Sequence, residues 1–106
     1  MLENHKILAD LKKHLILNYN GSIKEIVLFG SHASGKSTQD SDYDVLIVLD
    51  NDYSTKDENM ILDLCYDINL KYDILIDAHL LSQREIETKR GKQPIFVNAL
   101  KNGIHA

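Results

Sequence analysis

The sequence predicts one compact α/β or α+β domain, a small sheet flanked by helices in the order α-β-β-α-β-α-α. Three observations support this prediction. The length of 106 residues is enough for one core and leaves little room for a second. Several segments place apolar residues at helical spacing, and short runs of aliphatic and β-branched residues separate them. We therefore expect residues 1–106 to form a single domain.

The first eighteen residues predict a helix. Leu8, Leu11 and Leu15 recur there at helical spacing. Asn20-Gly21 then supplies a stop, because glycine tolerates the left-handed conformation that often follows a helix. The first strand should begin only after this pair.

Two strands with a polar loop between them are expected next. Residues 26–29 (IVLF) favour a strand that ends at Gly30. Residues 30–42 are small and polar and predict a loop. Residues 43–49 (YDVLIVL) are apolar on both faces beyond Asp44, which suits a central strand covered on both sides.

A helix and a third strand follow. Thr55-x-x-Glu58 is typical of a capping box, in which each side chain satisfies an unpaired N–H of the other residue. Apolar residues keep helical period behind it to about Leu70. Residues 73–77 (DILID) then favour a strand.

The C-terminal part predicts two further helices. Ser82-x-x-Glu85 is a second capping box, which should open a short helix that stops near Gly91. Pro94 suits the first turn of a last helix, since the N–H that proline lacks would be unpaired there anyway. Gly103 suits the end of that helix.

Composition excludes several classes of protein. The hydrophobic fraction of 43% and charged fraction of 26% are ordinary for a soluble globular domain and exclude disordered and collagen-like chains. The net charge of −4 argues against a broad basic surface for nucleic acid. No stretch approaches the roughly 20 apolar residues of a membrane helix. Cys65 has no second cysteine to pair with, so we expect a reducing cytoplasm. Its place on the apolar face of the predicted helix favours a buried thiol.

One motif in the predicted loop matches a different class of protein. Residues 30–37 (GSHASGKS) fit the P-loop pattern G-x-x-x-x-G-K-[ST] at every required position. A P-loop also needs a helix that starts at the GKS, because the N–H groups of that helix complete the phosphate cradle. Here polar residues and then a strand follow. A P-loop NTPase and a turn without any ligand are therefore secondary alternatives.

Carboxylates gather around the predicted strands. Asp42 and Asp44 stand two residues apart where the chain enters the second strand, so period-2 geometry places both on one face. Such charges repel each other, and Mg²⁺ or Mn²⁺ would neutralise them. Asp77 lies in the apolar body of the third strand and completes the cluster if the two strands are neighbours. Asp73 is the alternative third member. Three carboxylates beside a Gly-Ser loop suggest two-metal phosphoryl or nucleotidyl chemistry.

The stretch from Gly30 to Leu49 resembles a family signature. Gly30-Ser31, followed after ten residues by Asp42-x-Asp44, has the spacing of the polymerase-β-like nucleotidyltransferases, especially the minimal nucleotidyltransferases of prokaryotes. The later segment YDILIDAHLLS resembles the third strand of that family more loosely. The resemblance implies the fold of that family, a small mixed sheet flanked by helices.

The resemblance implies a role for each matching position. Gly30 and Ser31 would bind the β- and γ-phosphates of ATP or another nucleoside triphosphate. Asp42 and Asp44 would hold two metal ions, Mg²⁺ or Mn²⁺. Asp77 would help to hold the metal beside the acceptor and is placed to accept the hydroxyl proton.

The phosphate-binding loop departs from the family pattern. Many relatives carry arginine at the positions that His32 and Ser34 occupy here, and this change removes bidentate phosphate contacts. Lys36 supplies a positive charge instead, as a mobile point rather than a fork. His79 shares a strand face with Asp77 and could enter the site, although packing at the core or an edge is the commoner role of such a histidine.

The resemblance also implies an activity and a partner. The chain would move AMP from ATP to a hydroxyl of a protein or other macromolecule. No acceptor-binding domain follows the last expected helix, so another chain or the acceptor should supply one wall of the site. The implied partner is a small helical HEPN-domain toxin, which this chain would neutralise as an antitoxin, with homo- or hetero-oligomers both open. A catalytically inactive binding module is the alternative, favoured by the missing arginines.

Overall fold

The computed structural model describes residues 2–19, 21–37 and 41–106. The elements run along the chain as α1 (Leu2–Asn18), β1 (Ile23–Phe29), α2 (Ser31–Ser34), β2 (Tyr43–Leu49), α3 (Thr55–Tyr72), β3 (Ile76–Ser82), the 3-10 helix η1 (Arg84–Glu87), α4 (Pro94–Asn102) and β4 (Ile104–His105). The strands form one mixed sheet in the order β3-β2-β1-β4. β1 pairs antiparallel with β2 and β4, whereas β2 and β3 are parallel. The predicted fold class is confirmed.

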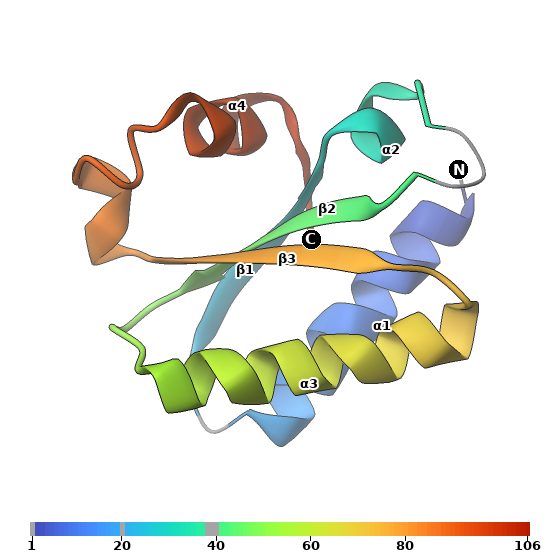
Figure 1. Cartoon of the computed structure of the whole chain (residues 1–106), viewed down its shortest axis with the longest axis horizontal. Coiled ribbons are helices and arrows are strands. Elements are labelled where there is room, and N and C mark those ends of the chain that lie inside the picture. The colour runs from blue at the N-terminus through green and yellow to red at the C-terminus, as the bar shows by residue number, and fades with distance from the viewer. Residues whose placement is uncertain (1, 20, 38–40) are drawn as a thin grey trace.

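Helices cover both faces of the sheet (Figure 1). α1 and α3 pack on one face, and α4 lies on the other. Successive residues of a strand point to opposite faces, so Val45 and Ile47 join the core under α1 and α3, while Leu46 and Val48 join the core under α4. This double burial explains the continuous apolar run of β2 and confirms its prediction as a central strand.

Three short elements differ from the prediction. The predicted loop at 30–42 contains the one-turn helix α2. The short helix after Ser82 is the 3-10 turn η1 and ends at Glu87, before Gly91. The two-residue strand β4 was not predicted, because its only basis is pairing with Val27 and Leu28 far away in the chain.

The start of α3 lies one residue earlier than the capping pattern predicted. Ser54 is the N-cap, and its side chain accepts a hydrogen bond of 3.1 Å from the N–H of Asp57. The Asp57 carboxylate accepts one of 2.9 Å from the N–H of Ser54. The capping box is therefore Ser54 with Asp57 rather than Thr55 with Glu58, because Ser54 has the extended backbone that an N-cap requires.

The end of α3 corrects the prediction for the third strand. The helix continues to Tyr72, and Asp73 closes it with a left-handed backbone (φ 53°) and an N–H bonded to the carbonyl of Asn69. Asp73 is therefore part of a helix cap, and β3 runs from Ile76 to Ser82 rather than from Asp73 to Asp77.

Glycine plays different parts at the ends of α1 and α4. α1 ends at Asn18, and Asn20 lies outside the described residues. The glycines of the described chain with positive φ are Gly30 and Gly35, so the predicted left-handed stop at Gly21 is wrong. Gly103 does end α4, as predicted, and its N–H donates to the carbonyl of Ala99 at 2.8 Å.

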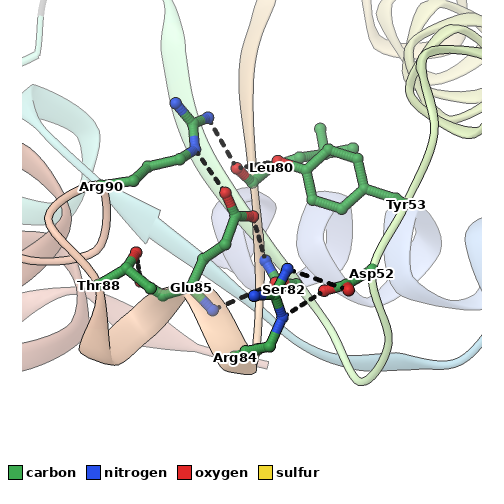
Figure 2. Close-up of polar contacts among 8 residues, drawn as sticks. All are labelled: Asp52, Tyr53, Leu80, Ser82, Arg84, Glu85, Thr88 and Arg90. Carbon is green, nitrogen blue, oxygen red and sulfur yellow. Dashed lines mark hydrogen bonds and ion pairs between the residues drawn. The ribbon is translucent and has the colours of Figure 1, made fainter.

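Polar contacts anchor the segment between β3 and α4 (Figure 2). Glu85 accepts a hydrogen bond of 3.0 Å from the N–H of Ser82, and the N–H of Glu85 donates to the Ser82 hydroxyl at 3.2 Å. This exchange confirms the second predicted capping box. Arg90 bonds the Leu80 carbonyl at 3.0 Å and pairs with Glu85 at 3.4 Å. Its guanidinium also lies 5.2 Å from the centre of the Phe96 ring, which links this network to α4.

Two further expectations concern burial and membranes. Cys65 is 3% exposed in the core under α3, and burial raises the pKa of its thiol to about 12, so the thiol is buried as predicted. Among the described residues, the helices all lack the length and apolar character that crossing a bilayer demands.

Candidate active site

The sheet register brings three chain segments together at one edge. Phe29 of β1 pairs with Asp44 of β2, and Asp44 pairs with Asp77 of β3. Since β1 runs opposite to β2 and β3, the end of β1 meets the beginnings of the other two strands. Gly30 and Ser31 follow Phe29 directly, so the Gly-Ser turn and α2 lie over this edge (Figure 1).

Gly30 lies directly against the carboxylate of Asp44. Its backbone combines a positive φ of 76° with a ψ of −153°, a conformation that is essentially restricted to glycine. A Cβ built at this position would also overlap the Oδ2 atom of Asp44. The position therefore requires glycine for two independent reasons, and the close approach seats the turn against the carboxylate.

The charges around Asp44 disfavour its ionised form. Burial raises the pKa of the Asp44 carboxyl, and the negative charges of Asp77 and Asp42 raise it further. The imidazoles of His79 and His32 lower the same pKa by a smaller amount than burial raises it. A divalent cation at this point would relieve the repulsion between the carboxylates.

The carboxylates of Asp44 and Asp77 form a three-membered group with His79. One potential ligand atom from each residue lies within 4.8 Å of the others. The Nε2 atom of His79 is 3.5 Å from the Oδ2 atom of Asp77. The His79 ring also packs against Phe29 and Phe96, with ring centres 5.7 and 6.3 Å apart. The histidine is thus both packed and at the site, and its two-residue spacing from Asp77 was the sequence signal for this.

The other two predicted carboxylates lie differently. Asp42 is exposed, precedes β2 and lies outside the group of three, although its charge acts on Asp44. Asp73 is exposed in the cap of α3 and also lies outside that group. Of the two candidates for the third carboxylate, Asp77 is therefore the one that the fold brings to Asp44.

His32 fastens the turn to the chain that enters β2. Its Nε2 atom lies 2.9 Å from the carbonyl oxygen of Ser41. Its ring stacks on Tyr43 with centres 3.7 Å apart and planes 11° from parallel. The imidazole is therefore engaged by protein groups on its edge and on its face.

The predicted phosphate-loop residues occupy the turn around α2. Ser31 begins this helix, and its carbonyl accepts from the N–H of Lys36 at 3.0 Å. Ser34 and Lys36 are exposed. Since α2 begins at Ser31 and ends at Ser34, the described residues Lys36 and Ser37 start no helix. The P-loop alternative is therefore wrong, because its phosphate cradle requires a helix at that point.

Space for a ligand adjoins the Gly-Ser turn. A cavity of about 260 Å³ lies between this turn and α4. Its lining residues are Phe29, Gly30, Ala33, Ser34, Asn98, Asn102 and Gly103.

The carboxylates of Asp44 and Asp77 and the His79 nitrogen form a donor set that fits a divalent cation, since carboxylate oxygen and imidazole nitrogen are both common metal ligands.

Comparison with known proteins agrees with this geometry. The model of the nucleotidyltransferase domain family matches residues 6–102. Two Methanocaldococcus jannaschii proteins that carry the name protein adenylyltransferase are similar over nearly their whole length. MJ0604 is 34% identical over 102 residues, which is 96% of each chain, and MJ0141 is 31% identical over 101 residues, or 95% of each chain.

Solved structures share the fold at low sequence identity. A mutant of the toxin–antitoxin complex MntA–HpeT aligns with a TM-score of 0.62 and 16% identity, over 92% of this chain and 69% of the other. A toxin–antitoxin structure with AMP-PNP gives 0.61 and 18%, over 92% and 69%. A Sulfolobus solfataricus structure described as a nucleotidyltransferase gives 0.59 and 18%, over 94% and 76%.

The fold and the edge that joins a Gly-Ser turn to paired carboxylates define a nucleotidyltransferase. With the family model matching most of its length, this chain belongs to the nucleotidyltransferase domain family.

Proposed function

We propose that this chain transfers the adenylyl group of ATP to a hydroxyl of a partner protein. The observation that carries the proposal is the register Phe29–Asp44–Asp77, which sets a Gly-Ser turn directly against two carboxylates. The names of the two M. jannaschii relatives support a protein acceptor, and the AMP-PNP of a structural neighbour supports an adenine nucleotide.

In this proposal, each residue of the site has a separate role. The turn at Gly30 and Ser31 binds the β- and γ-phosphates, and the exposed Lys36 adds a mobile positive charge near them. Asp44 and Asp77, with Asp42 from the preceding segment, hold divalent cations. Such cations screen the charge of the triphosphate and of the leaving pyrophosphate. Asp77, the more exposed of the two paired carboxylates, accepts the proton of the attacking hydroxyl as the oxygen bonds the α-phosphorus and pyrophosphate leaves.

The partner in this proposal is a toxin, with this chain as its antitoxin. Two structural neighbours are toxin–antitoxin complexes, which supports a partner of this kind. The resemblance to minimal nucleotidyltransferases makes a small helical HEPN-domain protein the first candidate. Modification of a hydroxyl on that protein would neutralise it.

A binding module without catalysis is the second candidate. The specific observation in its favour is His32, which occupies a position where many relatives carry arginine. Its ring is stacked on Tyr43 and its Nε2 atom is bonded to Ser41, so it offers the phosphates no fixed guanidinium. In this case the chain would neutralise its partner by binding alone.

Labelled ATP distinguishes the two candidates. Purified protein is incubated with native lysate, Mg²⁺ or Mn²⁺, and ATP labelled at either the α- or the γ-phosphate. We expect α-label on a protein band, lost in the variant Asp42→Asn/Asp44→Asn and retained in Asp63→Asn, an exposed position on α3. Absence of α-transfer, with the partner still bound in the carboxylate variant, would favour the binding module.

A further inference from the structure

We propose that His79 is a nitrogen ligand of the cation site and makes it favour first-row transition ions such as Mn²⁺ and Co²⁺ over Mg²⁺. The inference rests on the proposed function, because Asp44 and Asp77 hold the cation in both. It adds a residue that neither the family match nor the names of the relatives assign.

The position of His79 fits a ligand. Asp77 and His79 are two residues apart on β3, so their side chains leave the same face of the sheet. The Nε2 atom of His79 is 3.5 Å from the Asp77 carboxylate, and the Asp44 carboxylate completes the group within 4.8 Å. Adjacent ligands of an octahedral ion with bonds near 2.1 Å lie about 3 Å apart, so small side-chain adjustments complete the site.

The ring of His79 is held in place by apolar neighbours. Phe29 and Phe96 are 7% and 3% exposed, and both rings contact the imidazole. Phe96 belongs to α4, which Arg90 contacts from the network at the other end of β3. Because packing fixes the ring, its Nε2 atom faces the carboxylates before any cation binds, which lowers the entropy lost on binding.

The chemistry of the three ligands determines which cation the site prefers. Mg²⁺ is a hard ion that favours carboxylate oxygen and water and gains little from an imidazole. First-row transition ions bind nitrogen more tightly, in an order that rises from Mn²⁺ through Co²⁺. A site of two carboxylates and one imidazole therefore gains affinity for these ions while its affinity for Mg²⁺ depends on the carboxylates.

The chain contains a matched control. His14 on α1 lies 2.8 Å from Asp67 on α3, a histidine–carboxylate pair on the opposite side of the sheet. Within the described residues, this pair is not part of any three-membered group of potential ligands. A substitution at His14 removes the same kind of side chain without touching the proposed cation site.

The experiment measures cation binding directly. The full chain is stripped of cations and titrated with Co²⁺, followed by its visible absorption, and then with Mg²⁺ in competition. We expect His79→Gln to weaken Co²⁺ binding about tenfold or more, with a much smaller effect on Mg²⁺, and His14→Gln to bind both as the wild type does. Equal losses for both ions, or no loss for either, would overturn the proposal.

A second measurement uses the wild-type chain, so that the test does not depend on the folding of His79→Gln. In the wild-type chain, Zn²⁺ binding should shift the ¹⁵N resonance of His79 Nε2 and leave that of His14 unchanged; an unmoved His79 resonance overturns the proposal. Transfer of α-label by the wild type with Mg²⁺ is scored separately. Transfer without an effect at His79 leaves the proposed function intact, and His79 ligation without transfer rejects that function alone.

Discussion

Gly30 places the backbone of the Gly-Ser turn against the Asp44 carboxylate, so a single added methyl group should impair both the stability of the fold and the activity. Gly30→Ala forces alanine into a positive-φ backbone that only glycine adopts readily, and drives its Cβ into Asp44. We expect a stability loss of about 1–3 kcal/mol together with loss of nucleotidyl transfer. Urea unfolding and α-label transfer measure the two effects.

The control for this change is Gly35→Ala. Gly35 also has a positive φ, 77°, but its ψ of 12° places it in the left-handed helical region, and a Cβ there meets nothing within 4 Å. The backbone strain should be smaller than at Gly30, and transfer should persist. Equal losses of transfer in both variants would show that transfer is sensitive to any added side chain in this turn, and would contradict a specific role for the contact between Gly30 and Asp44.

The raised pKa of Asp44 predicts that the site opposes folding when no cation is bound. A carboxyl whose folded-state pKa lies above the ordinary 3.8 ionises less readily in the folded chain. The free energy of unfolding therefore falls as pH rises from about 3.8 through the raised value, and the loss persists at neutral pH. Asp44→Asn should then melt at a higher temperature than the wild type at pH 7 without divalent cations.

The higher melting temperature of Asp44→Asn should disappear below pH 3.8, where Asp44 is protonated in both the folded and the unfolded chain. Asp63→Asn removes one negative charge at an exposed position of α3 and serves as the matched variant. A lower melting temperature for Asp44→Asn at pH 7 would show that Asp44 stabilises the fold through contacts that outweigh its burial and charge repulsion.

At the scale of elements, the cap of α3 provides a direct test. Ser54 exchanges hydrogen bonds with Asp57, whereas Thr55 is the first residue of the helix. Ser54→Ala should cost about 1 kcal/mol of stability, and Thr55→Ala should cost less than about half of that. Urea unfolding decides between them, and the reverse order would mean that the helix begins one residue later.

Sequence patterns predicted α1, β2, α3 and α4 well, whereas they misplaced β3 and missed or misassigned the shortest elements. The apolar run of β2 and the helical period of α3 come from burial over many residues, which leaves a clear pattern. β4 has two residues and exists through pairing with β1, so no local pattern announces it. Asp73 is acidic beside an aliphatic run in sequence, yet its left-handed backbone makes it a helix cap.

In the candidate site too, some residues could be predicted from the sequence and others depend on tertiary packing. Motif spacing placed Gly30 near Asp44, and Asp77 was expected to join them only if the second and third strands were neighbours. The register of the sheet makes those strands neighbours and brings the three residues together. His79 was only noted for its shared face, because its approach to the carboxylates depends on Phe96 of α4 holding the ring. Tertiary packing of this kind cannot be inferred from the spacing of two residues on one strand.

At the scale of the whole molecule, the cation should be part of the stability of the fold. The group of Asp44, Asp77 and His79 joins β2 and β3, so an ion held there binds the folded chain and not the unfolded one. A cation at 100 times its dissociation constant adds about 2.7 kcal/mol. For a domain of this size that corresponds to a rise in melting temperature of about 10 °C.

Calorimetry with a chelator and then with Mn²⁺ tests this coupling. The wild type should show the rise, and Asp44→Asn/Asp77→Asn should melt at the same temperature with and without the ion. The carboxylates repel each other in the empty site and attract the ion in the loaded one. Without Mn²⁺, the double variant should therefore have the higher melting temperature. As Mn²⁺ is added, the melting temperature of the wild type should rise toward that of the double variant. A rise of the same size in both proteins would place the stabilising ion elsewhere in the molecule.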